Sequence, residues 1–321
     1  MVYKAITGTF LDEITYDIPS SNWGKKEWAT EFETLKRAGI DTVIVIRSGL
    51  GEKLACPSKA VSRFVPTLPV YQDMVALFLE LAAQNGMRLF LGLYDSNRFW
   101  YRNDWQMEVD INREFVREAL DRYGSLPAFA GWYLPHETGD TSCRIIDIHA
   151  SLAEEIRNLS GLPILISPYF HGRLDPMHVV AFGERAFPRT VEEHVRQWSE
   201  IFSRLEGLVD YCAFQDGSSE LLRLEEFVRA TAEIAKRHKI ELWSNLETFD
   251  RDMPIKFPPI DWRKLVYKLD VVQPYVSKVI TFEFSHFLSP NSVWPAARNL
   301  YRRYEEFLRA KGCQYGAVPE A

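Results

Sequence analysis

The chain has 321 residues, of which 46% are hydrophobic and 26% are charged, proportions that argue against the disordered and membrane classes. The net charge is −6 without a long basic run, so we expect no nucleic-acid partner, because phosphate binding needs clustered Lys and Arg. No apolar stretch reaches the ~20 residues that span a bilayer, so we expect no membrane partner.

The cysteines and the first residues indicate a reduced, intracellular setting. The chain runs from Met1 straight into a strand-like segment without an apolar leader, so we expect a cytoplasmic protein. The cysteines are widely spaced, form no CxxC pair and show no metal-ligand spacing: Cys56, Cys143, Cys212 and Cys313.

Strand-like and helix-like segments alternate along the chain. The strands are short apolar runs rich in β-branched residues, which is typical of strands covered on both faces. We expect eight of them, at residues 5–10, 42–46, 88–93, 129–134, 163–167, 209–214, 241–247 and 279–284. Apolar spacing of i, i+3, i+4 predicts helices at 25–37, 71–84, 112–122, 143–158, 191–205, 222–237, 262–269 and 295–310, with Thr190 as an N-cap.

The links between these segments are asymmetric. Several helix-to-strand links are short and predict left-handed caps at Gly39, Gly86 and Gly161. Most strand-to-helix links are long, as in a barrel whose loops after the strands form the functional face. No GxGxxG follows the first strand, unlike a doubly wound nucleotide-binding sheet. We therefore predict an α/β fold, a single-domain (β/α)8 TIM barrel that spans residues 1–321 as a catalytic domain.

Two glutamates occupy like positions at the ends of predicted strands four and seven. Glu247 shares its side of the strand with Trp243 and Asn245, and a polar residue at the end of a barrel strand points into the mouth. Glu137 follows Pro135, which lacks an N–H and ends the strand, so Glu137 is expected at the rim. Two carboxylates in one aromatic cleft are what glycoside hydrolysis needs. In the alternative interpretation, each is a loop carboxylate in solvent.

Glu283 lies within the eighth predicted strand. Alternation would pack Phe282 and Phe284 against helices and turn Glu283 toward the barrel interior. Glu283 is then either a third active-site acid or a member of a buried polar network, and the sequence leaves both open.

Other polar and aromatic residues follow the predicted strands. The polar ones are either ligands of sugar hydroxyls or turn residues, and the loop aromatics either stack on sugar rings or form a lid. The predicted substrate-binding set is His136, Glu283, Asp216, Asp95, Asp12, Arg47, Tyr94, Trp100, Trp105, Tyr169, His171, Asn245 and Trp243.

A metal site is the rival chemistry. Four histidines, His136, His171, His178 and His286, fall after predicted strands with Asp and Glu nearby, but no HxH or HExxH spacing occurs. We therefore expect no metal and no cofactor, with a metal-dependent lyase or isomerase as an alternative function.

Glutamates after the fourth and seventh of eight strands resemble the large clan of retaining glycoside hydrolases on (β/α)8 barrels. In that clan the strand-four Glu is acid/base and the strand-seven Glu is nucleophile, roles that the resemblance gives to Glu137 and Glu247. Segments 6–10, 131–137 and 243–247 more specifically resemble a bacterial family classed as domains of unknown function within the glycosidase-type barrels. One departure is His136, because the clan's acid usually follows an Asn that binds the sugar 2-hydroxyl.

The sequence therefore predicts a glycosidase that acts on an oligosaccharide or glycoside. The resemblance implies Glu137 as acid/base, Glu247 as nucleophile and retention of configuration. A carbohydrate-binding barrel without catalysis is the second alternative. No residue pattern specifies the sugar, the linkage or the oligomeric state.

Overall fold

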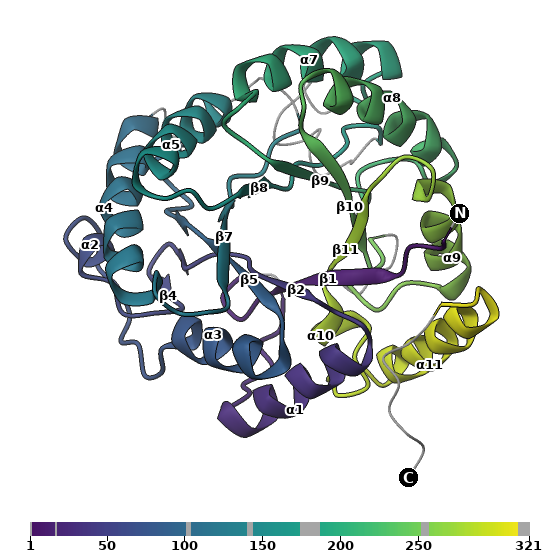
Figure 1. The fold of residues 1–321 in the computed structure, drawn as a ribbon, viewed down its shortest axis with the longest axis horizontal. Helices are drawn as coiled ribbons and strands as arrows, with labels where there is room; N and C mark the ends of the chain where they lie inside the picture. The colour runs from purple at the N-terminus through teal and green to yellow at the C-terminus, as the bar shows by residue number, and fades with distance from the viewer. Residues whose placement is uncertain are drawn as a thin grey trace.

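The computed structural model describes residues 2–16, 18–100, 104–139, 144–173, 187–251 and 257–313. Eight parallel strands close into a barrel with helices around it, which confirms the predicted (β/α)8 fold (Figure 1). In spatial order the strands are β1 (Ile6–Leu11), β2 (Thr42–Val45), β5 (Arg88–Gly92), β7 (Phe129–Leu134), β8 (Ile164–Ile166), β9 (Tyr211–Gln215), β10 (Glu241–Glu247) and β11 (Lys278–Phe282), which pairs with β1.

The outer ring of helices lies where apolar periodicity predicts it. It consists of α1 (Lys25–Arg37), α3 (Met74–Asn85), α4 (Trp105–Tyr123), α5 (Ile145–Leu159), α7 (Val191–Leu205), α8 (Leu224–Arg237), α9 (Trp262–Val272) and α11 (Pro295–Ala310). The prediction for α4 was wrong at its start, because the helix begins at Trp105 and not at Asn112. Two buried polar residues, Glu108 and Asn112, interrupt the apolar pattern of its first turns.

The predicted helix ends are largely confirmed. Thr190 caps α7 through its side chain, which accepts a hydrogen bond from the N–H of Glu193. Gly39 and Gly86 adopt φ values of 80° and 71°, the left-handed conformation that glycine favours. The prediction for Gly161 was wrong, because α5 ends through Ser160 in an extended conformation.

Alternation along the strands divides the core in two. Inward-facing side chains fill the barrel: Phe10, Ile44, Ile46, Phe90, Tyr133, Leu165, Ala213, Trp243 and Ile280. Outward-facing side chains such as Val43, Leu89 and Trp132 pack against the helices. The inner-face positions of each strand therefore reach the mouth of the barrel at the carboxyl end of the strand.

Short elements that the sequence did not predict follow the strands at the mouth. A three-stranded sheet joins the loops after β2 and β5, and it consists of β3 (Gly49–Leu50), β4 (Lys53–Leu54) and β6 (Tyr94–Asp95). The helical turns are α2 (Lys59–Ser62), η3 (Leu221–Arg223) and α10 (Phe284–Phe287). Because β3 pairs with β6, the segments that carry Arg47 and Asp95 are held together.

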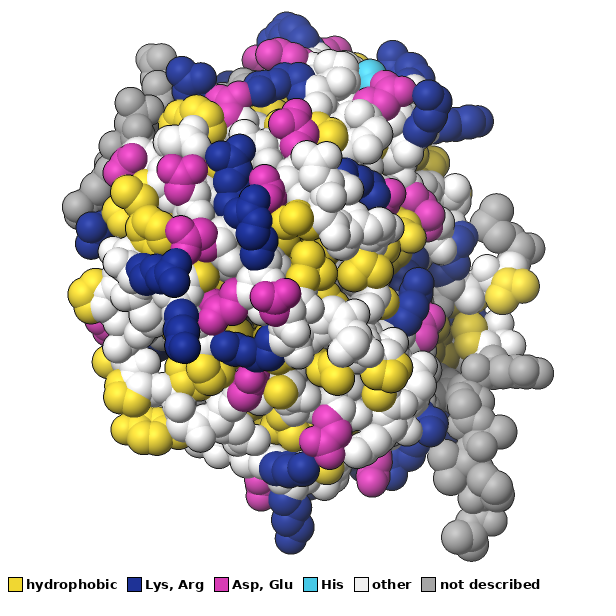
Figure 2. All heavy atoms as spheres, turned by 60° about the vertical axis from the view of Figure 1, so that its left-hand side comes forward, with side chains coloured by type: hydrophobic (Ala, Val, Ile, Leu, Met, Phe, Trp, Pro, Cys, Tyr) yellow, Lys and Arg dark blue, Asp and Glu magenta, His cyan; other side chains and the backbone are white. Residues whose placement is uncertain are grey.

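The outer surface carries charges of both signs. On the face that turns the left-hand side of Figure 1 forward, Lys and Arg side chains are interspersed with Asp and Glu and with small apolar areas (Figure 2). Among the described helices, none combines the length and apolar character needed to cross a membrane. Three described cysteines, Cys56, Cys212 and Cys313, are free thiols, whereas Cys143 lies outside the described residues.

Candidate active site

Glu137 and Glu247 reach the same mouth of the barrel from β7 and β10. Glu247 is the last residue of β10, and Glu137 stands three residues beyond the end of β7. Burial is the main cause that raises the pKa of Glu137, and the nearby Glu247 carboxylate raises it further, while Arg47 and Arg251 lower it. The charge of Glu247 therefore acts on Glu137 and disfavours its ionisation.

Arg47 connects Glu137 to Asp95. Its Nη2 lies 3.5 Å from Oε1 of Glu137, and its Nε donates to Oδ2 of Asp95 at 3.2 Å. Burial alone would raise the pKa of Asp95, but Arg47 and other hydrogen-bonding neighbours lower it overall. Asp95 is therefore an anion that fixes the guanidinium beside Glu137, in the loops where the sequence predicted both residues.

A buried layer behind Asp95 supports it. The indole N–H of Trp100 donates to Oδ1 of Asp95 at 2.9 Å, and its ring lies edge-on against His136. Trp100 is only 8% exposed, so it packs beneath the mouth and is not the exposed aromatic residue that the sequence predicted.

His136 points away from the mouth. Alternation from β7 turns it behind the barrel wall, where its Nε2 lies 2.9 Å from Oε1 of Glu108 on α4. The sequence prediction of a substrate contact by His136 was therefore wrong. Glu108, which sequence reasoning missed, also accepts hydrogen bonds from the backbone N–H and hydroxyl of Ser96.

Asp95, Glu108 and His136 are the candidate metal ligands among the described residues. One potential ligand atom of each lies within 4.8 Å of the others, and all three residues are buried. However, His136 and Glu108 are hydrogen-bonded to each other, and Asp95 is bonded to the guanidinium of Arg47. A bound cation would have to displace these bonds beside a fixed positive charge, so the donor set fits a hydrogen-bond network better than a metal.

Arg251 holds Glu247 in place. Its Nη2 and Nε donate to the two oxygens of Glu247 at 2.9 and 3.1 Å, a bidentate arrangement. A Cβ added to Gly217 would overlap Oε2 of Glu247, so only glycine allows this approach. Sequence reasoning missed both Arg251 and Gly217.

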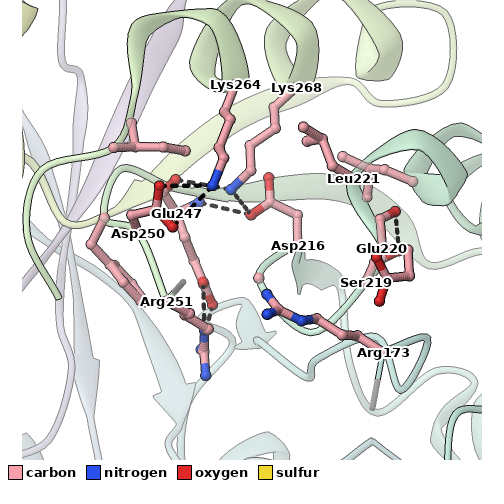
Figure 3. A pocket seen from close by; sticks show the side chains of 14 residues that line it. Arg173, Asp216, Ser219, Glu220, Leu221, Glu247, Asp250, Arg251, Lys264 and Lys268 are labelled. Atoms are coloured by element: carbon pink, nitrogen blue, oxygen red, sulfur yellow. Dashed lines mark hydrogen bonds and ion pairs between the residues drawn. The ribbon is translucent and has the colours of Figure 1, made fainter. Parts of the chain in front are cut away.

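Asp216 and Lys268 lie next to Glu247 (Figure 3). Asp216 accepts hydrogen bonds from Lys268 Nζ at 2.7 Å and from the N–H of Glu247 at 3.1 Å. Burial raises the pKa of Asp216 to about 6, although Lys268 opposes the shift. These residues border a cavity of about 190 Å³ between the loops after β9 and β10.

Asn245 lies in a polar layer one step below Glu247. Its side-chain amide donates to Ser167 Oγ at 3.0 Å, and Gln215 donates to the carbonyl of Ser167 at 2.7 Å. Trp243, two residues further down, is at the wrong end of the strand for a substrate contact. It stacks on Tyr211 at a centroid distance of 4.4 Å and donates its indole N–H to Glu241.

Three further predicted ligands are structural. Tyr94 is fully buried and donates its hydroxyl to the carbonyl of Gly51 at 2.8 Å. Trp105 opens α4 and packs against the outer core. Asp12 is 2% exposed, and its Oδ1 accepts the backbone N–H groups of Ile14 and Thr15, so it forms the turn after β1.

Glu283 belongs to a buried network, one of the two interpretations that the sequence left open. It is fully buried, and its Oε2 accepts hydrogen bonds from the backbone N–H of His286 at 2.6 Å and from Nδ1 at 3.0 Å. The prediction that Phe282 packs against the helices was wrong, because Phe282 contacts Phe10 on the inner face, whereas Phe284 packs against Tyr301 of α11 as predicted.

Tyr169 and His171 follow β8. The ring of Tyr169 packs on Gly139, in the loop that carries Glu137, where an added Cβ would overlap the ring. His171 is partly exposed, and its carbonyl accepts the N–H of Arg189. The structure therefore places Tyr169 beside the Glu137 loop, and His178 lies outside the described residues.

A (β/α)8 barrel with paired glutamates at the ends of its fourth and seventh strands has the architecture of the glycoside hydrolase barrels. The chain belongs to the family described as Domain of unknown function (DUF4434), whose model matches residues 6–294. None of the curated proteins compared with it matches.

Solved structures show the same architecture. A protein named "putative alpha-L-fucosidase" from Bacteroides thetaiotaomicron is 39% identical, with a TM-score of 0.89 over 96% of this chain and 94% of the other. An endo-1,4-beta-D-mannanase from Thermotoga petrophila is 13% identical, with a TM-score of 0.55 over 95% and 100%. A family 1 β-glucosidase from Thermotoga maritima is 10% identical, with a TM-score of 0.57 over 98% and 99%. The last two support the fold alone.

Proposed function

We propose that this protein hydrolyses the glycosidic bond of an oligosaccharide or glycoside. The observation that carries the proposal is the contrast between its two carboxyl groups. Glu137 has a raised pKa, as a general acid needs, whereas Glu247 is paired with two N–H donors of Arg251. Carboxyl groups in contrasting environments are the usual source of separate acid and nucleophile roles.

The proposed reaction proceeds with retention. Glu137 protonates the leaving oxygen while Glu247 attacks the anomeric carbon, and Glu137 then removes a proton from the water that releases the sugar. A retaining enzyme needs carboxyl groups ~5–5.5 Å apart, whereas an inverting enzyme holds them ~6.5–9.5 Å apart. The Glu247 carboxylate raises the pKa of Glu137, which supports a close pair.

The substrate screen starts from the relatives. The 39% identical protein carries the name "putative alpha-L-fucosidase", so aryl α-L-fucosides come first, followed by aryl mannosides, aryl glucosides and natural oligosaccharides. NMR of the first-formed product gives its anomeric configuration. Retained configuration supports the proposed route, and an inverted product would overturn it. Turnover that disappears with a chelator and returns with a metal would favour a metal-dependent enzyme instead.

Azide distinguishes the two glutamates. With an activated aryl glycoside, Glu247→Gly should lose nearly all turnover, and azide should restore it as a glycosyl azide of inverted configuration. Glu137→Ala should also respond to azide, but with a glycosyl azide of retained configuration, because Glu247 still forms the covalent intermediate. An unchanged rate in Glu247→Gly would refute its role, and identical azide products from both variants would refute the division of roles.

A further inference from the structure

We propose that Asp216 and Lys268 are positioning residues that replace the missing strand pairing at Glu247 and hold its backbone for catalysis. This inference rests on the proposed function of Glu247. It concerns residues that do not touch the reacting atoms, so it goes beyond the assignment of the two glutamates.

The end of β9 leaves Glu247 without a ladder partner on one side. The pairing of β9 with β10 ends at Gln215 and Asn245, two residues before Glu247. On the other side, pairing with β11 continues, and the N–H of Thr248 donates to the carbonyl of Phe282. Successive residues of a strand direct their backbone groups to opposite neighbours. The N–H and C=O of Glu247 therefore face the side where β9 has ended.

Side chains take the place of that strand. Asp216 Oδ1 accepts the N–H of Glu247 at 3.1 Å, and Lys268 Nζ donates to the carbonyl of Glu247 at 3.1 Å. Lys268 also donates to Asp216 at 2.7 Å, which closes a ring of three hydrogen bonds. Both groups on the Glu247 backbone are thus satisfied by an ion pair anchored on β9 and α9 (Figure 3).

Stabilisation of the fold is by itself a weak explanation for the buried ion pair of Asp216 and Lys268. Lys268 lies on the apolar face of α9 with Leu265, Leu269 and Val272, and its side chain is 8% exposed. A buried ion pair of this kind is often no more stabilising than apolar residues of similar volume. Positioning of Glu247 gives the pair a specific role, because displacement by about 1 Å can lower a rate by roughly 10²-fold.

The ring also responds to pH. The pKa of Asp216 is about 6, so acid weakens its bonds to Lys268 and to the N–H of Glu247. Asp216 is faced by Lys268 from α9 and by Glu247 and Arg251 from β10 and its loop. The other charged residues around the cavity are Arg173, Glu220, Asp250 and Lys264.

Lys264 provides a matched control. It lies one helical turn before Lys268 on α9 and pairs with Asp250 at 2.8 and 3.1 Å, beside the same cavity. Its described bonds do not include the backbone of Glu247. Lys264→Met therefore removes a neighbouring lysine and its ion pair but leaves the three-bond ring intact.

The first test compares kinetics. Lys268→Met and Asp216→Asn should lower kcat by roughly 10- to 100-fold with little change in KM, because each change weakens the charge-assisted hydrogen bonds that hold the backbone of Glu247. Lys264→Met should lower kcat less than Lys268→Met does, and Lys268→Arg should recover part of kcat. In the wild type, kcat should fall on the acid side of its pH profile near pH 6, and this acid limb should disappear in Asp216→Asn. Equal losses in Lys268→Met and Lys264→Met, or an unchanged acid limb, would overturn the proposal.

The second test needs no activity. The amide ¹⁵N–¹H resonance of Glu247 in the full-length protein should titrate near pH 6 in the wild type and in Lys264→Met. It should not titrate in Asp216→Asn. If the wild type hydrolyses no glycoside but this resonance titrates as described, the proposed function fails while the ring stands. A Glu247 amide that is insensitive to Asp216→Asn would overturn the ring itself.

Discussion

Arg251 donates two hydrogen bonds to Glu247, at 2.9 and 3.1 Å, and so covers both oxygens of its carboxylate. Arg47 stands in a looser relation to Glu137, with one contact at 3.5 Å. The more tightly held carboxylate is also the less exposed one. The side chain of Glu247 is 2% exposed and that of Glu137 is 34% exposed. One glutamate is thus fixed and the other has room to exchange a proton with a ligand.

Replacement of Arg47 by Met should shift the ionisation of Glu137. Arg47 lowers the pKa of Glu137, so its removal should raise that pKa and move the basic limb of kcat/KM to higher pH. The variant should also unfold at lower temperature, since Asp95 loses a buried partner, a loss that costs about 3–5 kcal/mol. Measurement of the pH–rate profile checks the shift. Arg63→Met, which breaks an exposed pair with Glu114, should leave the basic limb in place, and an unshifted limb in Arg47→Met would contradict the prediction.

Gly217→Ala should impair turnover while it leaves the fold intact. The added Cβ would overlap Oε2 of Glu247 and lie 2.7 Å from Nε of Arg251, so the pair must move. We expect kcat to fall by roughly 10²-fold, the usual effect of a displacement of about 1 Å at a reacting group. Gly161→Ala is the control, because its Cβ would meet no atom within 4 Å. Equal kcat values for the two variants would show that the contact at Gly217 does not constrain Glu247.

The barrel and its two glutamates could be predicted because both follow from periodicity. A strand alternates every residue, so Trp243, Asn245 and Glu247 had to share the inner face once the strand was recognised. The same rule could have placed His136, since it lies one residue out of phase with Glu137. The prediction for His136 failed because its place next to Glu137 in the sequence was taken to mean that both side chains reach the mouth of the barrel.

The supporting charges were missed for a different reason. Lys268 and Glu108 each lie on the apolar face of a helix, where a pattern search counts them as interruptions. A charged residue in such a position is itself a signal, because its burial requires a partner. The partner could not be identified from the sequence. For Lys268 it is Asp216, 52 residues earlier, and only the barrel brings them together.

His286 should make the protein less stable in base. Burial alone would lower the pKa of His286, but Glu283 raises it to about 9, above the ordinary value of 6.5. The raised folded pKa means that this stabilisation is complete below about pH 6.5 and is lost as the pH rises through about 9. A shift of this size corresponds to roughly 3 kcal/mol. Urea unfolding of the wild type and His286→Gln at pH 6, 8 and 10 measures it.

The difference between these two proteins isolates His286 from other groups that titrate in base. We expect the free-energy gap between the wild type and His286→Gln to be largest at pH 6 and small at pH 10. His238→Gln, at a more exposed pair with Glu206, should show a gap of less than about 1 kcal/mol throughout. A gap that does not change with pH would mean that His286 contributes by packing alone.

Glu137→Gln should lower the turnover of the enzyme and raise its melting temperature above pH 7. Loss of the general acid should lower turnover of substrates with poor leaving groups by roughly 10²- to 10⁴-fold. The folded state raises the pKa of Glu137, so the wild type binds this proton more tightly when folded and loses stability as the pH rises through that pKa. Gln has no such proton. Glu137→Gln should therefore melt at a higher temperature than the wild type above pH 7, and the difference should shrink toward pH 4.

Melting curves at pH 4, 5.5, 7 and 8 for both proteins check this expectation, with Glu33→Gln on the exposed face of α1 as the control. The control should show no growing difference from the wild type as the pH rises. The effect has a definite sign because burial and the Glu247 charge both oppose ionisation of Glu137, and Arg47 and Arg251 only partly offset them. If Glu137→Gln instead melted lower than the wild type at pH 8, the pairing with Arg47 would outweigh burial, and Glu137 would be a structural anion unsuited to proton transfer.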